Sequence, residues 1–301
     1  MSNVKTKSQT LKIILTFLLL LAGLIWGVTS QFPDDWLHLV FCDVGQGDAI
    51  LVVKGSAQIL IDGGPNEKVL ACLSNHLPFW DRQIELVVVT HPEADHLTGL
   101  VSVIQRYRVL QIVSNSLLAE SGIFQKFRAE VVNRQISVHS PRAGEEIKIG
   151  QIKLKILYPP EKLGKEIVWK TLEEPKVLGL SNYTGNFNKT AIVALLEFGD
   201  FQALLTADVG VEEEEKFLPV LGEVEVLKVG HHGSKYSTSE SLLAAIRPKL
   251  AVISVGANNR YGHPTPEVLS RLQAIGAQIR RTDLEGEVKV VSDGKSWYNG
   301  N

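Results

Sequence analysis

Short apolar runs broken by Gly, Asp and Asn dominate the chain from residue 36 onward. The runs "LHLVFCDVGQGDAILVV", "AQILIDGG" and "IELVVVT" are rich in β-branched residues and stop at polar or turn-forming residues, which is typical of buried strands. Segments with helical periodicity lie between such runs. We expect these helices within residues 67–77, 101–109, 121–133, 239–246 and 266–275.

Strands and helices alternate in two similar series, residues 36–134 and 190–291. This organisation predicts two sheets packed face to face, with helices on the outside. In the second series, Gly199 and Asp200 separate two apolar runs and predict a hairpin. The polar, proline-containing stretch 158–188 has no useful periodicity and predicts a long surface loop or lid.

The N-terminus has a different pattern, because an uncharged apolar run follows Lys5, Lys7 and Lys12. The run "IILTFLLLLAGLIWGVTSQFP" with its flank is long enough to cross a bilayer. We expect residues 1–33 to be a membrane anchor, or alternatively a cleaved signal segment, and residues 34–301 to form the folded domain. The lysines precede the run, so the positive-inside rule predicts that this domain is extracytoplasmic, anchored or secreted after cleavage.

Composition adds little about partners. The chain has 31 basic and 33 acidic residues, a net charge of −2 at pH 7, so no overall basic excess indicates a polyanionic partner. The hydrophobic content of 45% is ordinary for a globular protein with a sizeable core. Cys42 and Cys72 form no C-x-x-C motif, and we expect buried, unpaired thiols rather than a disulfide.

Three groups of histidine and acidic residues, far apart in the sequence, each follow a predicted strand. They are His91, Glu93, Asp95 and His96 in "VVVTHPEADHLTGL", Asp208 in "LLTADVG", and His231 and His232 in "LKVGHHGS". Strand ends of an α/β protein gather at one edge of the sheet, so we expect these groups to converge. Imidazoles and carboxylates are ligands for Zn²⁺, Mn²⁺ or Fe, and a bridging carboxylate suits two metal ions.

Six motifs in series resemble one known family. They are "FCDVGQGDAIL", "LIDGG", "THPEADHLTGL", "LLTADVG", "LKVGHHGSKYSTSE" and "PKLAVISVGANNRYGHPTPEVLSRL", within residues 36–291. Together they resemble the metallo-β-lactamase-type hydrolase domain at the C-terminus of the ComEC DNA-uptake proteins. The resemblance implies an α/β fold, a four-layer αβ/βα sandwich with the metal centre between the sheet edges, here preceded by one N-terminal hydrophobic helix.

The resemblance also implies roles for the polar clusters. His91 matches a ligand of the first metal, Asp95 and His96 match ligands of the second, Asp208 matches the bridging carboxylate and His231 matches a further ligand of the second. Together with Glu93, these residues are the expected ligands of one or two Zn²⁺ or Mn²⁺ ions. Asp95, Asp208 and His232 are the expected catalytic residues.

Two positions depart from the family pattern. Glu93 stands where most members have His or Asp, and its extra methylene requires a shift or an intervening water. The histidine that many members place before the bridging Asp is absent, and Asn188 is the nearest polar residue. The first metal is therefore expected to be weak, recruited with substrate, or absent.

Further residues have expected roles around the metals. Asp62 orients a ligand or forms a turn, while Asp43, Gln46 and Asp48 belong to the family's signature loop. His232, Ser234 and Lys235 are candidates to bind an oxyanion, with Lys235 alternatively a solvated charge, and His263 is expected at the site edge. The basic residues expected around the cleft are Lys228, Lys235, Arg260, Arg280 and Arg281. We expect structural or surface roles for His38, His76 and His139.

The function expected from these motifs is metal-dependent phosphodiester hydrolysis, most simply of DNA, in competence-related uptake. The alternatives are another esterase of the same fold, such as a phosphorylcholine esterase, lactonase or β-lactamase, or a non-catalytic module. ComEC proteins also carry a multi-helix membrane channel, whereas this sequence has one hydrophobic segment. A separate DNA-uptake channel protein is therefore an expected partner, beside the membrane and a DNA or other phosphodiester substrate.

Overall fold

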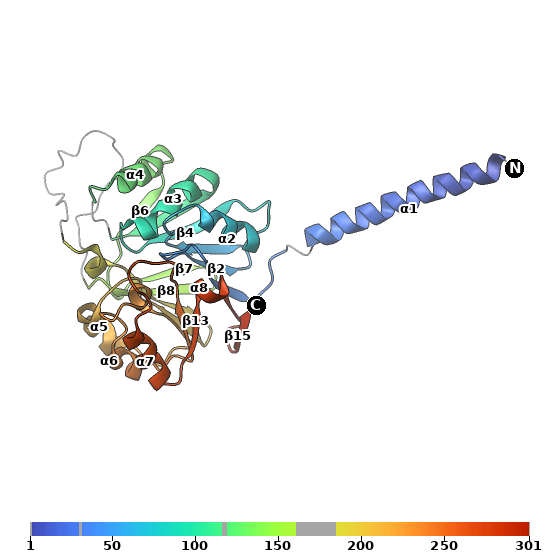
Figure 1. Ribbon diagram of the computed structural model, residues 1–301. Helices are drawn as coiled ribbons and strands as arrows, with labels where there is room; N and C mark the ends of the chain where they lie inside the picture. Colours follow the sequence, from blue (N-terminus) through green and yellow to red (C-terminus); the bar gives the residue numbers. More distant parts are fainter. Residues whose placement is uncertain (1, 30–31, 116–118, 161–184, 301) are drawn as a thin grey trace.

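Two β-sheets pack face to face in the computed structural model (Figure 1). The structure describes residues 2–29, 32–115, 119–160 and 185–300, and it describes side chains from residue 12 onward. The first sheet has the order β15(Trp297–Gly300), β14(Val288–Ser292), β1(Leu37–Phe41), β2(Ile50–Lys54), β3(Ala57–Ile61), β4(Gln83–Val89), β5(Arg108–Ser114), β6(Ser137–His139). The second has the order β13(Gln278–Arg281), β12(Leu250–Ile253), β11(Val226–Lys228), β10(Phe201–Leu205), β9(Val193–Phe198), β8(Ile152–Tyr158), β7(Glu146–Ile149).

Helices cover the outer face of each sheet, so the four-layer αβ/βα sandwich expected from the sequence is confirmed (Figure 1). The first sheet is covered by α2(Lys68–His76), α3(Ala94–Arg106) and α4(Gly122–Asn133). The second is covered by α5(Val211–Phe217), α6(Glu240–Ile246) and α7(Pro266–Ala274). The remaining helical turns are η1(Phe187–Thr190), η2(Leu218–Val220), η3(Gly230–Gly233) and α8(Thr282–Glu285).

Three clusters of buried apolar residues hold the layers together. One lies between the two sheets and joins side chains such as Leu39 and Leu205. The other two lie between each sheet and its helices, around Leu100 and around Leu242. Removing this apolar surface from water is the main force that assembles the sandwich.

The strand connections differ from the two consecutive halves expected from the sequence. The hairpin at Gly199 and Asp200 is confirmed, because β9 and β10 pair antiparallel around it. However, β7 and β8 belong to the second sheet, while β14 returns to the first and pairs with β1, with Leu37 opposite Ser292. The alternating apolar residues of β14 therefore complete the first sheet rather than extend the second.

Helix α3 begins seven residues earlier than the periodicity predicted and includes the charged cluster in its first turn. Its buried face runs through Leu97, Leu100, Val103 and Ile104, which is a regular helical spacing. Asp95 and His96 are thus fixed on a helix rather than on a loop.

Cys42 and Cys72 form a disulfide, so the expectation of unpaired thiols is wrong. Cys42 follows β1 and Cys72 lies in α2, with a Cα–Cα distance of 5.9 Å. Their separation of 30 residues in sequence concealed their proximity, because α2 packs on the face of the first sheet beside the end of β1.

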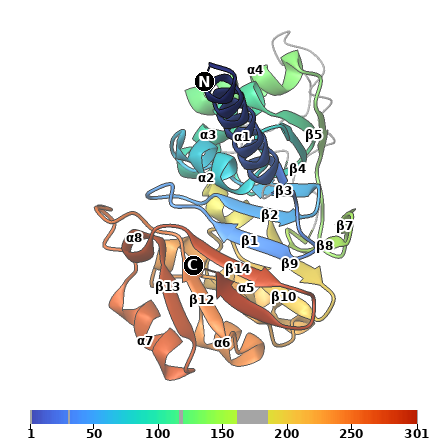
Figure 2. The ribbon, with the colours of Figure 1, turned by 90° about the vertical axis from the view of Figure 1, so that its right-hand side faces the viewer.

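Helix α1(Ser2–Thr29) extends away from the sandwich (Figure 1) and therefore lies in front of the domain in the view turned by 90° (Figure 2). Among the described residues it is the one helix long and apolar enough to span a membrane, with a mean hydropathy of 2.1 over Lys12–Thr29. None of this window is buried. Most of the loop expected at 158–188 lies outside the described residues.

Candidate metal centre

Residues that follow parallel strands of both sheets supply the candidate metal centre. Asp62 follows β3, the cluster beginning at His91 follows β4, Asp208 follows β10, and the histidine pair follows β11. Asp62, His231 and His232 have φ values of 58°, 46° and 54°. Left-handed backbone is unfavourable for such residues and concentrates at functional sites. These turns point polar side chains from two sheets toward one place.

Four residues form the centre of the site: Asp95, His96, Asp208 and His232. One ligand atom of each lies within 4.8 Å of the others. Asp208 Oδ2 lies 3.4 Å from His96 Nε2 and 3.3 Å from His232 Nε2, and Asp95 Oδ2 lies 3.6 Å from His232 Nε2. The sequence-predicted convergence of the strand-end clusters is thus present in the structure.

Hydrogen bonds on the far side of the rings orient His96 and His232. His96 Nδ1 donates to Asp62 Oδ2 at 2.8 Å, and His232 Nδ1 donates to the Ser254 carbonyl at 2.9 Å. Each Nε2 then carries the free lone pair when the ring is neutral. Both Nε2 atoms, and Asp208 Oδ1, are buried and have no hydrogen-bond partner in the part of the chain that the structure describes.

The ring of His91 is also held through its Nδ1 atom, which leaves Nε2 free. The Thr90 hydroxyl donates to Asp62 Oδ2 at 2.6 Å, so its oxygen accepts from His91 Nδ1 at 3.0 Å. His91 Nε2 is therefore also an acceptor, buried and without a hydrogen-bond partner among the residues that the structure describes. The ring centroid of His91 lies 4.1 Å from that of His96. Burial and the positive charge of His96 lower the pKa of His91 to about 3, so the ring is neutral at pH 7.

Opposite charges fill the centre in the absence of a metal. Burial opposes the charged form of His96 most strongly, but the carboxylates of Asp208 and Asp62 outweigh it and raise its pKa well above the usual range. Burial also opposes the charged form of His232, but the carboxylates of Asp208 and Asp48 outweigh it and raise the pKa of His232 well above the usual range. Burial also opposes the ionised form of Asp208, yet His232 and His96 hold the pKa of Asp208 well below its usual range.

His231, Asn188, His263 and Glu93 lie around this centre. His231 Nε2 is 3.9 Å from Asp208 Oδ2 and 3.4 Å from Asn188 Nδ2, so the structure places His231 outside the four-residue group and His232 inside it. The ring of His263 lies 5.8 Å from that of His231. Glu93 precedes α3 and is half-buried, and burial with Asp95 and Asp208 raises its pKa.

A buried ion pair beneath the site was not expected from the sequence. Lys228 is fully buried, and its Nζ lies 2.6 Å from Asp48 Oδ2 and donates to the Val229 carbonyl. Asp48 Oδ1 in turn lies 3.5 Å from His232 Nδ1. The expectation that Lys228 is one of the basic residues around the cleft is therefore wrong. The sequence signal was a lysine within the apolar strand "VLKVG".

The remaining predicted residues have structural contacts at the rim. Asp43 accepts from the Gly45 amide, and Gln46 Oε1 accepts from the Gly256 amide, joining the signature loop to the second sheet. Ser234 is buried and accepts from the Tyr236 amide, while Lys235 is exposed over the Tyr236 ring. Arg280 pairs with Glu285 and Arg281 with Asp283, so both guanidinium groups are already engaged by carboxylates.

The three histidines that are expected to be structural or surface residues lie outside the centre, and each has an acidic partner. His38 pairs with Asp34, His76 with Glu287 and His139 with Glu145, at 2.8–2.9 Å. The partners of His76 and His139 lie 211 and 6 residues away in sequence, so helical spacing alone did not reveal them.

Comparison with known proteins identifies the family. Residues 42–257 match the model of the metallo-beta-lactamase superfamily, which covers more than half of the chain. The chain belongs to the metallo-β-lactamase superfamily. Members of this superfamily typically bind divalent metal ions and are usually metal-dependent hydrolases. The donor set fits such an ion, because three buried imidazole nitrogens and a carboxylate oxygen have no hydrogen-bond partner among the described residues.

Among superfamily members, the chain is similar to ComEC-type competence proteins, as the motifs indicated. It is 26% identical to ComE operon protein 3 of Bacillus subtilis, over 82% of this chain and 32% of that protein. It is 29% identical to Recombination protein 2 of Haemophilus influenzae, over 82% of this chain and 28% of that protein. The chain thus spans about 30% of the length of these relatives.

Solved structures support the superfamily fold. The metallo-beta-lactamase fold protein YhfI from Bacillus subtilis aligns with a TM-score of 0.54 at 10% identity. The alignment covers 89% of this chain and all of that chain. At this identity the likeness concerns the fold alone.

Proposed function

We propose that this protein is a metal-dependent phosphodiesterase that cleaves DNA on the extracytoplasmic side of a membrane. The observation that carries the proposal is the orientation of His91, His96 and His232, whose Nδ1 atoms are all held by protein acceptors. Their Nε2 atoms, with the Asp208 carboxylate, are left as a convergent donor set. DNA is the proposed substrate because the similar proteins are competence proteins.

In this proposal Asp95, His96, Asp208 and His232 hold one divalent ion, which corresponds to the second metal of the family pattern. His91, Glu93 and His231 are the candidates for the other ion. Zn²⁺ and Mn²⁺ both accept imidazole and carboxylate ligands. A bound divalent ion would supply the Lewis-acid chemistry and water activation that phosphodiester hydrolysis uses. Asp62 and the Ser254 carbonyl keep the ligand rings in the required orientation.

The residues at the rim have distinct proposed roles toward a phosphodiester. Burial chiefly lowers the pKa values of His263 and His231, which favours the neutral rings. His263 is the proposed hydrogen-bond donor to a phosphate oxygen, whereas His231 is the candidate metal ligand. Lys235 is exposed beside them and supplies a positive charge. Asn188, whose Nδ2 lies 3.4 Å from His231 Nε2, positions that ring.

Two features support an extracytoplasmic location. The apolar window of α1 follows lysines in the sequence, the arrangement of the positive-inside rule. The Cys42–Cys72 disulfide belongs to an oxidising compartment, since cytosolic thiols are kept reduced. We propose a separate DNA-uptake channel as the partner, because the similar proteins are competence proteins.

The test is DNA cleavage by the purified full chain loaded with Mn²⁺ or Zn²⁺. Asp208→Asn should abolish cleavage and lower the metal content, because Asp208 lies within 3.3–3.9 Å of three imidazoles. Asp200→Asn, at the exposed hairpin turn, is the matched control and should leave both unchanged. Turnover of carboxylic esters or small phosphodiesters with intact DNA would replace the nuclease by another hydrolase of this superfamily. Metal binding without any turnover would indicate a non-catalytic module.

A further inference from the structure

Three exposed aromatic side chains gather next to the end of the apolar helix. Phe32 follows α1, and Phe79 and Trp80 lie in the loop between α2 and β4. Their exposed fractions are 63%, 63% and 42%. The ring centroids of Phe32 and Trp80 lie 5.6 Å apart, and those of Phe79 and Trp80 lie 4.8 Å apart. We call these three residues the aromatic patch.

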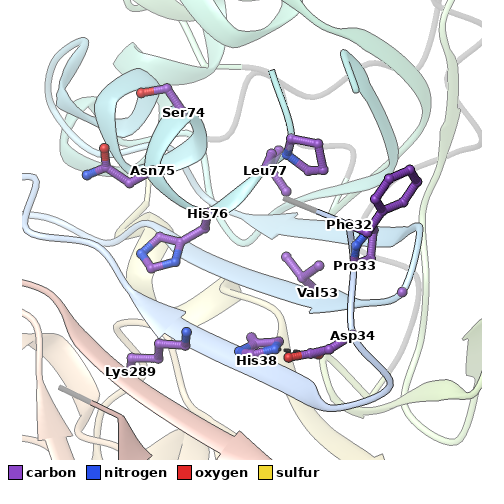
Figure 3. A pocket seen from close by; sticks show the side chains of 12 residues that line it. Phe32, Pro33, Asp34, His38, Val53, Ser74, Asn75, His76, Leu77 and Lys289 are labelled. Carbon is purple, nitrogen blue, oxygen red and sulfur yellow. Dashed lines mark hydrogen bonds and ion pairs between the residues drawn. The ribbon is translucent and has the colours of Figure 1, made fainter. Parts of the chain in front are cut away.

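The patch continues into a pocket of about 260 Å³ (Figure 3). Phe32, Pro33 and Leu77 line one part of this pocket, whereas His38, His76 and Lys289 line another. Apolar and aromatic side chains beside the charged Asp34 and Lys289 and two hydrogen-bonding histidines form an amphipathic surface. Such surfaces suit the boundary between lipid headgroups and acyl chains, where Trp and other aromatic residues concentrate.

The chain length between the helix and the patch limits what can cover it. Phe32 is three residues beyond Thr29, where α1 ends, so their Cα atoms lie at most about 11 Å apart. If α1 spans a bilayer, its end at Thr29 is at the membrane surface, and Phe32 has to be there too. Trp26, 76% exposed, is in the last turn of the same helix.

The topology places the patch and the metal centre at opposite ends of the strands of the first sheet. Trp80 lies shortly before the beginning of β4, and His91 lies just after its end. β4 has seven residues, which at about 3.3 Å per residue separate the two edges by roughly 20 Å. A domain seated on its aromatic patch would therefore turn the metal centre away from the membrane.

We propose that the aromatic patch docks on the bilayer interface and holds the metal centre facing away from the membrane, toward the solvent. The inference rests on the proposed role of α1 as an uncleaved anchor. It adds a fixed orientation, in which the substrate approaches from the aqueous side rather than along the bilayer surface. The occupant of the patch is the lipid interface, and a protein partner is the competing outcome.

Tryptophan quenching in the full chain tests the orientation. The protein is purified from the membrane fraction and reconstituted into liposomes of phosphatidylcholine brominated near the headgroup end or near the tail end of the acyl chains. The emission of Trp80 is obtained as the difference between the unmodified chain and Trp80→Phe. We expect most of this emission to be lost with bromine near the headgroup end, and less with bromine near the tail end.

The matched control places a tryptophan on the opposite edge. Tyr236 follows η3 beside the metal centre and is 70% exposed, so Tyr236→Trp in the Trp80→Phe background should show no added quenching. Equal quenching at both positions, or an unquenched Trp80, overturns the docking. An N-terminally shortened chain in the cells would overturn the anchor and the docking together. In every one of these cases the nuclease proposal is tested separately, by metal-dependent cleavage.

Discussion

At the scale of single residues, Asp208 is the side chain on which the site depends. Its carboxylate is 2% exposed and faces the rings of His96 and His232. In the metal-free protein this carboxylate balances two imidazolium charges, and in the loaded protein it is a proposed metal ligand. The same residue thus contributes to stability in one state and to metal binding in the other.

Asp208→Asn should destabilise the metal-free protein, because His96 and His232 lose their shared partner. Breaking a buried ion pair costs about 3–5 kcal/mol when the remaining charge stays, and less when the rings can release their protons. Urea unfolding of the chelator-treated protein measures the change. A metal-free variant as stable as the unmodified chain would show that the site carries no net pairing energy.

Lys228 and Asp48 provide a second prediction at this scale. Lys228→Met should lower the free energy of unfolding by about 3–5 kcal/mol, since Asp48 is left charged in a buried position. Lys228→Met combined with Asp48→Asn should recover a large part of this loss, because neither charge remains. The double-mutant cycle is measured by urea unfolding. Additive losses would mean that the two residues act independently.

Metal affinity should rise with pH. The folded-state pKa values of His96 and His232 are raised by Asp208 with Asp62 or Asp48. Their stabilising effect on the metal-free protein is full below the unfolded pKa of about 6.5 and is lost as pH rises through the folded values. Metal binding needs both rings neutral, so it releases protons and strengthens across that window.

The measurement is competition with a chelator of known pH dependence, from below neutrality into the alkaline range. The logarithm of the binding constant should rise by about two per pH unit while both rings are protonated, and by about one while a single ring is protonated. His91 adds no such dependence near neutrality, because its pKa is about 3. A constant affinity across the range would mean that His96 and His232 are neutral before the metal binds.

At the scale of elements, the carboxyl ends of strands deliver every part of the metal centre. The sequence predicted this convergence, because each polar cluster directly follows an apolar strand. The resemblance assigned the ligand role to His231, whereas His232 lies closer to Asp208 in the structure, at 3.3 Å against 3.9 Å. This difference depends on the left-handed backbone at His231 and His232. The sequence did not predict that Asp48 and Lys228 meet, because they lie 180 positions apart and pair only when the two sheets close.

The disulfide was missed for the same reason, and it carries the element-scale prediction. It joins the end of β1 to α2 across 30 residues, and cross-links of this length contribute about 3–4 kcal/mol in the chain-entropy model. Reductant should therefore lower the free energy of unfolding by about that amount. Urea unfolding with and without reductant measures the loss, and the Cys42→Ser, Cys72→Ser chain should be insensitive to reductant. Two titratable thiols in the unreduced, unfolded protein would contradict the bond.

At the scale of the whole molecule, charge determines how DNA can approach. The net charge is −2, and five carboxylates lie in or near the metal centre: Asp48, Asp62, Glu93, Asp95 and Asp208. One or two divalent ions would add about +2 to +4 and reverse the local field. DNA binding should accordingly require metal.

The cationic residues near the cleft are fewer than the sequence suggested. Lys228 is buried against Asp48, and Arg280 and Arg281 are paired with carboxylates. Of the five expected residues, Lys235 and Arg260 remain exposed and take part in none of the ion pairs found among the described residues. Direct phosphate contacts should therefore number about one or two.

This count predicts a shallow salt dependence for binding to single-stranded DNA. Each neutralised phosphate contributes about −0.7 to the slope of log K against log salt, so the slope should be about −0.7 to −1.4. Fluorescence anisotropy with labelled DNA and a non-hydrolysing divalent ion gives the slope. Lys235→Ala and Arg260→Ala should each make the slope shallower by about 0.7. Lys249 directly precedes β12, at the end of the strand away from the metal centre, and pairs with Glu225, so Lys249→Ala should leave the slope unchanged. A slope steeper than about −3 would require phosphate contacts on another surface, and the DNA path would then have to run beyond the metal centre and its rim.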